Sequence, residues 1–304
     1  MKRFVVVVAL MAGAGALAFA GVADTKADAA GEYARFKIEF AEKPFTEQHL
    51  AAHRMGQRLY DELGIEGFGV CDETFAFGCY HAFFGGAIHD RGAEVVPELA
   101  AACRERFGNN STGCEHGIGH GLIEHFGRER LEKALELCGT TKQKHPLFGC
   151  TGGVFMEYNS AVTFPDGSAI VDVRKPDAQN LHAPCTDVRK EYRTSCYFEI
   201  GLWWKQVLGK DYTRIGNMCA DAASAGERDA CARGWGTVVA ETVAYDPEEA
   251  DALCGAIHDA SLVDACTLGV AMRFFGTGSH DGEGLRMCDL IRGGLAEECK
   301  SLAL

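Results

Sequence analysis

The stretch Cys114-Glu115-His116-Gly117-Ile118-Gly119-His120-Gly121-Leu122-Ile123-Glu124-His125 carries the two patterns that decide the fold and the chemistry of this chain. It begins at a cysteine, and the preceding cysteine, Cys103, lies 11 residues earlier. It then places His116, His120 and Glu124 four residues apart, which puts them at about 0°, 40° and 80° around a helix axis. The stretch therefore predicts a helix that begins at a cysteine and carries three potential metal ligands on one face.

Cysteines recur in pairs along the whole chain. The 14 cysteines form seven adjacent pairs: Cys71 with Cys79, Cys103 with Cys114, Cys138 with Cys150, Cys185 with Cys196, Cys219 with Cys231, Cys254 with Cys266, and Cys288 with Cys299. Apart from one enlarged interval, corresponding cysteines repeat every 32–36 residues, a period typical of helix-turn-helix repeats. The repeat favours adjacent pairing over the other connectivities that the count allows. We therefore expect an all-α solenoid of about seven helical hairpins, each stapled by one disulfide.

Each unit follows one local pattern. A helical stretch ends at the first cysteine, as in Arg130–Cys138, and a second helix opens at the second cysteine, as in Cys266–Phe275. Asp246-Pro247-Glu248-Glu249 is a favourable helix start, with an Asp cap and Pro at the first position. Glycine stands three residues after the second cysteine at Gly117, Gly153, Gly234 and Gly269. Glycine weakens a helix, so its recurrence predicts close approach between neighbouring helices.

The paired cysteines, the period and runs such as Ala265-Cys266-Thr267-Leu268-Gly269-Val270 resemble a known repeat type. They are similar to the disulfide-bridged, tetratricopeptide-like αα repeats of secreted bacterial cysteine-rich proteins. The resemblance covers residues 71–299 loosely, and the turn between the cysteines is longer in this chain. It implies the architecture and carries no functional residue.

The first 20 residues read as a secretory signal peptide. Lys2 and Arg3 precede an apolar run, and Ala18-Phe19-Ala20 is a typical cleavage site. Removing residues 1–20 leaves 28 basic and 43 acidic residues, a net charge of −15. Such a charge disfavours nucleic acid as a partner, and no later run is long enough to span a membrane. Disulfides require an oxidising compartment, so we expect a periplasmic or secreted protein.

The rest of the chain divides around the repeats. Residues 21–44 are expected to form a linker, 45–70 an N-terminal capping helix, and 71–304 the repeat domain. The capping helix contains His49 and His53, which we interpret as solvated. The enlarged interval, at about 160–185, predicts an inserted loop that projects from the array.

Two neighbouring units share a histidine pattern. Counting from the second cysteine, positions +2 and +10 are His81 and His89 in the first unit, and His116 and Glu124 in the second. Imidazole suits zinc, copper, iron and nickel, and two ligands four apart on a helix can hold one ion. We therefore predict a site for a divalent transition metal (Cu, Zn or Fe) made by His81, His89, His116, His120 and Glu124. Four further histidines, His125, His145, His258 and His280, are expected to lie away from this face.

The leading functional interpretation is an exported protein that binds a metal ion or metallocofactor. The main alternative is a metal-free scaffold that binds a peptide or a partner protein in the solenoid concavity. A metal-dependent enzyme is the third possibility. Three tryptophans in later units, Trp203, Trp204 and Trp235, are expected to fill the core.

Overall fold

The computed structural model describes residues 25–141, 147–160, 172, 174–175 and 177–303. Those residues form helices and their connections, and no strand occurs among them. The predicted signal peptide, His145 and most of the first half of the predicted inserted loop lie outside them. The prediction of an all-α protein is confirmed for the part of the chain that is described.

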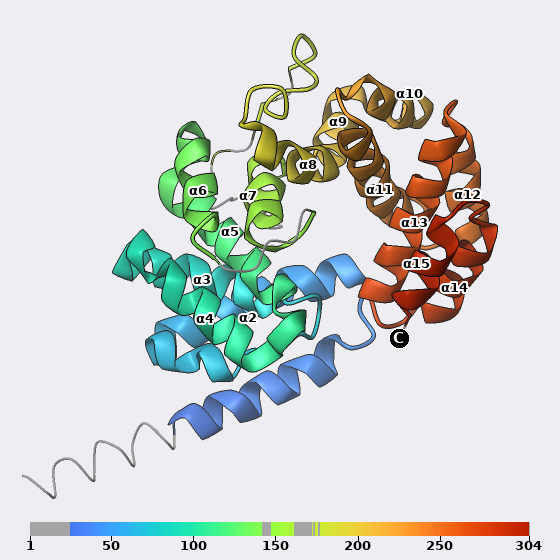
Figure 1. The fold of residues 1–304 in the computed structure, drawn as a ribbon. Helices are drawn as coiled ribbons and strands as arrows, with labels where there is room; N and C mark the ends of the chain where they lie inside the picture. The colour runs from blue at the N-terminus through green and yellow to red at the C-terminus, as the bar shows by residue number, and fades with distance from the viewer. Residues whose placement is uncertain (1–24, 142–146, 161–171, 173, 176, 304) are drawn as a thin grey trace, which may run out of the picture.

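Helices follow one another in the order drawn in Figure 1. Their bounds are α2 Phe45–Leu63, α3 Gly78–Arg91, α4 Val96–Phe107, α5 Thr112–Phe126, α6 Leu131–Cys138, α7 Gly149–Asn159, α8 Lys190–Glu199, α9 Gly201–Leu208, α10 Tyr212–Met218, α11 Ala225–Thr242, α12 Pro247–Gly255, α13 Ala260–Gly276, α14 Asp281–Leu290 and α15 Leu295–Ser301. Short 3₁₀ turns join several of them, the longest being Gly64–Gly69 after α2.

Seven disulfides join the adjacent cysteines of the repeat, with Cα–Cα distances of 5.3–5.7 Å. The bonded pairs are Cys71 and Cys79, Cys103 and Cys114, Cys138 and Cys150, Cys185 and Cys196, Cys219 and Cys231, Cys254 and Cys266, and Cys288 and Cys299. The adjacent connectivity that the repeat predicts is therefore confirmed.

The prediction that the second cysteine opens a helix holds only in part. It is accurate to within two residues in three units, where α3, α5 and α7 begin just before Cys79, Cys114 and Cys150. It is wrong in later units: α8, α11 and α13 begin six residues before Cys196, Cys231 and Cys266, and α15 begins four residues before Cys299. In α11 and α13 the side chains of Ser224 and Asp259 cap the first turn and so set the earlier start.

The helices that carry the second cysteines pack on one another in chain order, and α2 packs on the first of them. Each helix of the series α2, α3, α5, α7, α8, α11 and α13 contacts the next. The glycines three residues after the cysteine permit this approach: a Cβ on Gly153 would overlap the carbonyl oxygen of His116, and one on Gly234 would overlap that of Phe198. The predicted role of these glycines in close helix packing is confirmed, whereas the complete solenoid stays a prediction.

Replacing Gly234 by alanine is expected to destabilise the protein strongly. The new Cβ would displace α8 from α11, and overpacking of this kind costs roughly 3 kcal/mol. Gly226 lies in the same helix with open space around it, so Gly226→Ala should leave stability unchanged or raise it by up to about 1 kcal/mol. Denaturant unfolding of the two variants measures both values. Equal midpoints would contradict the close-packing role.

The expected linker at 21–44 is wrong over residues 25–40, which are helical. Tyr33 and Phe36 are buried, and the Tyr33 hydroxyl donates to Asp72 Oδ1 over 2.8 Å. Lys37 forms an ion pair with the other Asp72 oxygen, at 2.5 Å. These residues recur at helical spacing, so the segment packs against the repeats along one face.

The later part of the inserted loop is fixed to the array by Arg174. Its guanidinium lies 3.3 Å from the ring centroid of Trp203 and donates to Asn159 Oδ1 and the Ala183 carbonyl oxygen.

Trp203, Trp204 and Trp235 are at most 1% exposed, which confirms the prediction that they fill the core.

The first and last parts of the array meet. The Arg273 guanidinium of α13 lies 4.4 Å from the Phe45 ring centroid at the start of α2, and Arg273 also pairs with Glu241. Figure 1 shows the row of helices curving so that these two regions face one another.

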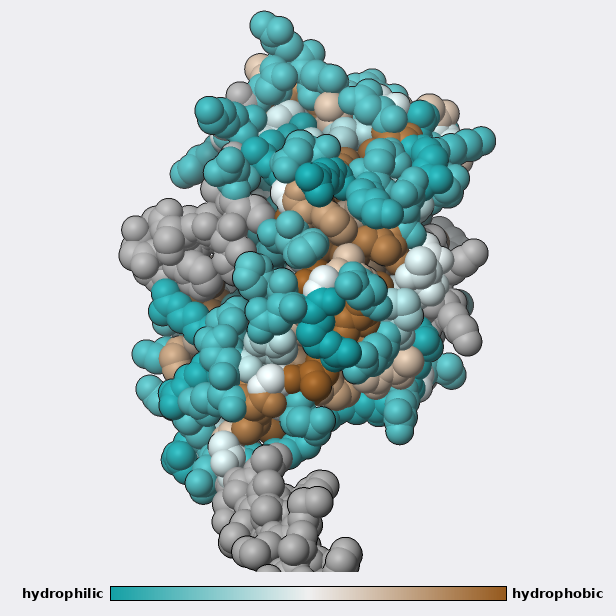
Figure 2. Space-filling view, turned by 90° about the vertical axis from the view of Figure 1, so that its left-hand side faces the viewer, coloured by the Kyte–Doolittle hydropathy of each residue, from teal (hydrophilic) through white to brown (hydrophobic). Residues whose placement is uncertain are grey.

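The side of the molecule at the left in Figure 1 is mostly hydrophilic, with a narrow hydrophobic band across it (Figure 2).

Candidate metal centre

Five histidine rings from three packed helices form one cluster. They are His49 and His53 from α2, His81 from α3, and His116 and His120 from α5. Neighbouring ring centroids lie 4.5–5.4 Å apart. Two groups of three have ligand atoms within 4.8 Å of one another, and both include His81. We call His49, His53 and His81 the first triad, and His81, His116 and His120 the second triad.

Close backbone packing brings these rings together. A Cβ on Gly56 of α2 would overlap the Cys79 carbonyl oxygen of α3, and one on Gly117 of α5 would lie 3.1 Å from the backbone of Tyr80. Because the helix axes approach this closely, side chains of ordinary imidazole length from all three helices reach a common point. Gly117, one of the repeat glycines, and Gly56 of α2 therefore bring the rings of the cluster together.

Three nitrogens converge in the first triad. His53 Nε2 lies 3.2 Å from His49 Nε2 and 3.0 Å from His81 Nδ1. Two imidazole nitrogens bound to one tetrahedral zinc ion, with bonds of about 2.0–2.1 Å, stand about 3.3–3.4 Å apart. The spacing is thus near that of a ligand set, and without an ion one N–H of His53 can serve both neighbours.

The outer histidines are oriented by fixed acceptors. His49 Nδ1 donates to the Phe75 carbonyl oxygen over 2.8 Å, and His120 Nδ1 donates to Glu157 Oε2 over 2.8 Å. The His116 ring hydrogen-bonds to the backbone of Gly149. Metal-ligating histidines almost always donate their second N–H to a carbonyl or carboxylate in this way, because it fixes the tautomer and directs the free nitrogen at the ion.

Two ring nitrogens of the cluster have no partner among the described residues. His120 Nε2 and His53 Nδ1 are buried and accept or donate no hydrogen bond there. Because Glu157 accepts the N–H of His120 Nδ1, Nε2 is the ring nitrogen that remains for a ligand. A buried polar atom without a partner is costly, and a cation bound at Nε2 would remove that cost.

Burial keeps the imidazoles neutral. It lowers the pKa of His49 to about 4. Burial, followed by the neighbouring imidazoles, lowers the pKa values of His53, His81 and His116 well below 6.5. At neutral pH these rings therefore present lone pairs rather than positive charge, as metal binding requires.

Buried carboxyl groups surround the second triad. Glu157 is fully buried and holds His120, whereas the Glu124 carboxyl lies over Gly85 of α3. Burial and the proximity of Glu157 raise the pKa of Glu124 well above 4.5. Burial also raises the pKa of Glu199 to about 8. A bound cation would stabilise the charged form of each of these groups.

The structure brings together only part of the predicted ligand set. His81, His116 and His120 meet, but His89 is exposed near the end of α3, and Glu124 is not in either triad. Eight residues along a helix rise about 12 Å, so a ligand at position +10 cannot share an ion with one at position +2. We correct the predicted site accordingly.

The sequence pattern missed two ligands because their helix was expected to be a solvated cap. His53 is 1% exposed and His49 is half-buried, and both point into the cluster. Their four-residue spacing, followed by Gly56 on the same helix, is a signal that could have identified them. His125 and His258 are exposed, as expected.

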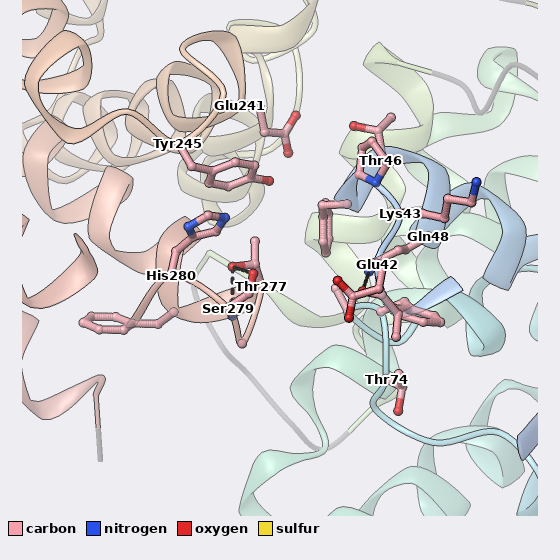
Figure 3. Close-up of a pocket in the computed structure, with 18 of the residues that line it drawn as sticks. Glu42, Lys43, Thr46, Gln48, Thr74, Glu241, Tyr245, Thr277, Ser279 and His280 are labelled. Carbon is pink, nitrogen blue, oxygen red and sulfur yellow. Dashed lines mark hydrogen bonds between the residues drawn. The ribbon is translucent and has the colours of Figure 1, made fainter. Parts of the chain in front are cut away.

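A cleft of about 870 Å³ lies beside the cluster, where the two ends of the array face one another (Figure 3). Lys43, Thr46 and Gln48 line one wall, and Tyr245 and His280 line the other. Phe75–Phe77 and Ala244–Tyr245 are the two runs of non-glycine residues with positive φ in the described chain. Four of these five residues line the cleft, and such strain clusters at functional sites.

No protein family model matches the sequence, and neither curated proteins nor solved structures give a significant match. Within the described ranges, no helix has the length and apolar character needed to cross a bilayer.

Proposed function

We propose that this protein is an exported, metal-binding helical-repeat protein, with the five-histidine cluster as its site. The observation that carries the proposal is the orientation of the rings. His49, His116 and His120 each donate one ring N–H to a fixed acceptor, which leaves the other ring nitrogen of each for a ligand. That of His120, Nε2, is buried without a partner among the described residues. Seven disulfides support an oxidising location outside the cytoplasm.

The donor set favours a particular class of ion. Imidazole nitrogen suits zinc, copper, iron and nickel, whereas magnesium, calcium and manganese prefer oxygen ligands. The cluster contributes only nitrogen within each triad. Among divalent ions in vitro, copper should therefore bind more tightly than zinc. Disulfides anchor α3 and α5, two of the three helices that carry the cluster, and such a fixed site fits a role in sequestering or delivering an ion.

Calorimetric titration of the untagged protein with Zn²⁺ and Cu²⁺ tests the proposal. We expect binding at neutral pH with a Kd well below about 10 μM, which corresponds to a binding free energy of roughly −7 kcal/mol. Weaker binding would indicate adventitious contacts rather than a built site. The double variant that combines His89→Gln with His125→Gln alters two exposed histidines on the same helices and should bind as the wild type does. Absence of binding in the wild type, or its loss in this control, would overturn the proposal.

Metal binding should persist at lower pH than for a surface histidine site. A ring with a lowered pKa stays neutral until the pH falls below that value, so protons compete with the metal ion for its nitrogen only at lower pH. We expect zinc affinity to be nearly constant from pH 7.5 to about 5.5 and to weaken toward pH 4, where His49 protonates. Calorimetry across this range measures it. A tenfold loss between pH 7 and 6 would instead indicate ordinary exposed imidazoles with pKa values of about 6.5.

The cleft favours a second candidate function, the binding of a peptide or partner protein. Its volume is in the range of ligand sites, and its walls combine aromatic rings with hydroxyl and charged groups. A metal-free protein that still captures a peptide, with loss of capture on Tyr245→Ala, would favour this function over the metal site.

A further inference from the structure

We propose that the histidine cluster is a relay: its two triads are alternative positions for a single ion, which passes between them while His81 stays bound. The inference rests on the proposed metal binding. It adds that the protein transfers the ion rather than holding it at one fixed point.

Because the two triads share His81, they lie side by side, and only one of them can be occupied at a time. His81 belongs to both groups of three, and its ring centroid lies 4.9 Å from that of His53 and 4.5 Å from that of His120. An ion in the first triad can therefore gain His116 and His120 as it loses His49 and His53. Each step breaks one metal–nitrogen bond and forms another, so the ion is never without protein ligands.

The transfer needs no oxidant, reductant or net proton. His53 carries its ring proton on Nδ1 while Nε2 binds the ion. When the ion leaves, His53 gives the Nδ1 proton to solvent and takes one up at Nε2, so no proton is gained or lost overall. The short contacts to His49 and His81 then allow a hydrogen bond from Nε2–H.

Each triad has its own partly exposed member. His49 in the first and His116 in the second are half-buried, whereas the shared His81 is 3% exposed and His53 and His120 are at most 2% exposed. A site built for storage would bury all its ligands or open at a single point. An ion can instead be received at one triad and released at the other.

Electrostatics favour the second triad as the resting position. The Glu157 carboxylate holds His120 there, and Gly152 leaves the Glu199 carboxyl close to His116. In the first triad, His49 donates to a backbone carbonyl oxygen, and His53 contacts the other two rings. The Arg273 guanidinium acts on His49 of the first triad and on Glu199 beside the second, so it does not distinguish the two positions. A divalent cation is stabilised by a nearby carboxylate, so the contact between His120 and Glu157 favours movement of the ion from the first triad to the second.

Titration with Co²⁺ tests the relay, because its visible bands report the coordination of the bound ion. Wild type should bind a single equivalent. His49→Gln removes the first triad and His120→Gln the second, so each should still bind a single equivalent, with different spectra. The wild-type spectrum should match that of His49→Gln, and affinity should fall more in His120→Gln. The double variant with both substitutions should bind none, and circular dichroism checks its fold.

Three results would overturn the relay while leaving metal binding intact. Two equivalents in the wild type would show a binuclear centre. Loss of binding in either single variant would show one undivided site. Identical spectra in the two single variants would show that the triads are not separate positions. If the wild type binds no Co²⁺, Zn²⁺ or Cu²⁺, the proposed function itself fails. If the double variant unfolds, the stoichiometry and the two single-variant spectra decide the question.

Discussion

Reduction of the disulfides is expected to unfold the protein at physiological temperature. Each bridge closes a loop of 8–12 residues, which the chain-entropy model values at roughly 2.5–3 kcal/mol. Seven such terms together exceed the total stability of about 5–15 kcal/mol that most domains have. Thermal melts with and without reductant should therefore differ by tens of degrees, or the reduced protein should show no cooperative transition.

A graded control separates the bridges from general effects of the reductant. Replacing both Cys288 and Cys299 by serine removes only the last bridge, so it should cost about 2.5–3 kcal/mol and leave the histidine cluster unchanged. Coincident melts of the oxidised and reduced protein would mean that helix packing alone maintains the fold.

The second large effect is expected from His81→Gln. His81 is the one residue common to both triads, so its loss leaves only two histidines in each. We expect zinc affinity to fall by about 100-fold or more, beyond the 10–100-fold cost of losing an outer-shell partner. Calorimetry at neutral pH measures the change.

His89→Gln is the matched control for this variant. His89 lies in the same helix but is exposed, so its replacement should leave both affinity and stoichiometry unchanged. Equal losses in the two variants would contradict the cluster as the site. A change in His81→Gln that is confined to stability, with affinity retained, would mean that His81 only fills space between the helices.

The repeat architecture could be predicted because its signals are local. A disulfide between adjacent cysteines joins residues of one unit, and the glycine three residues later contacts the neighbouring unit. The structure contains the disulfides as predicted, and Gly153 and Gly234 lie against the backbone of the preceding helix. The starts of α11 and α13 differ from the prediction because the cap residues Ser224 and Asp259 set them, several residues before the cysteine.

The candidate site was only partly predictable because it depends on contacts between units. Equivalence of sequence positions suggested His89 and Glu124, but the rise along a helix separates position +10 from position +2 by about 12 Å. His49 and His53 join the cluster only because Gly56 lets α2 lie against α3. The spacing of His49, His53 and Gly56 on α2 suggests a packed face, but it does not identify α3 as the helix that packs there.

Elemental analysis of the untagged protein, purified under non-chelating conditions from the compartment where it folds, shows whether the five-histidine cluster holds a metal ion. We expect a stoichiometric amount of one transition metal in the wild type and none in the variant that combines His49→Gln with His120→Gln. A wild-type protein that is free of metal and also fails to take up added zinc or copper would contradict it.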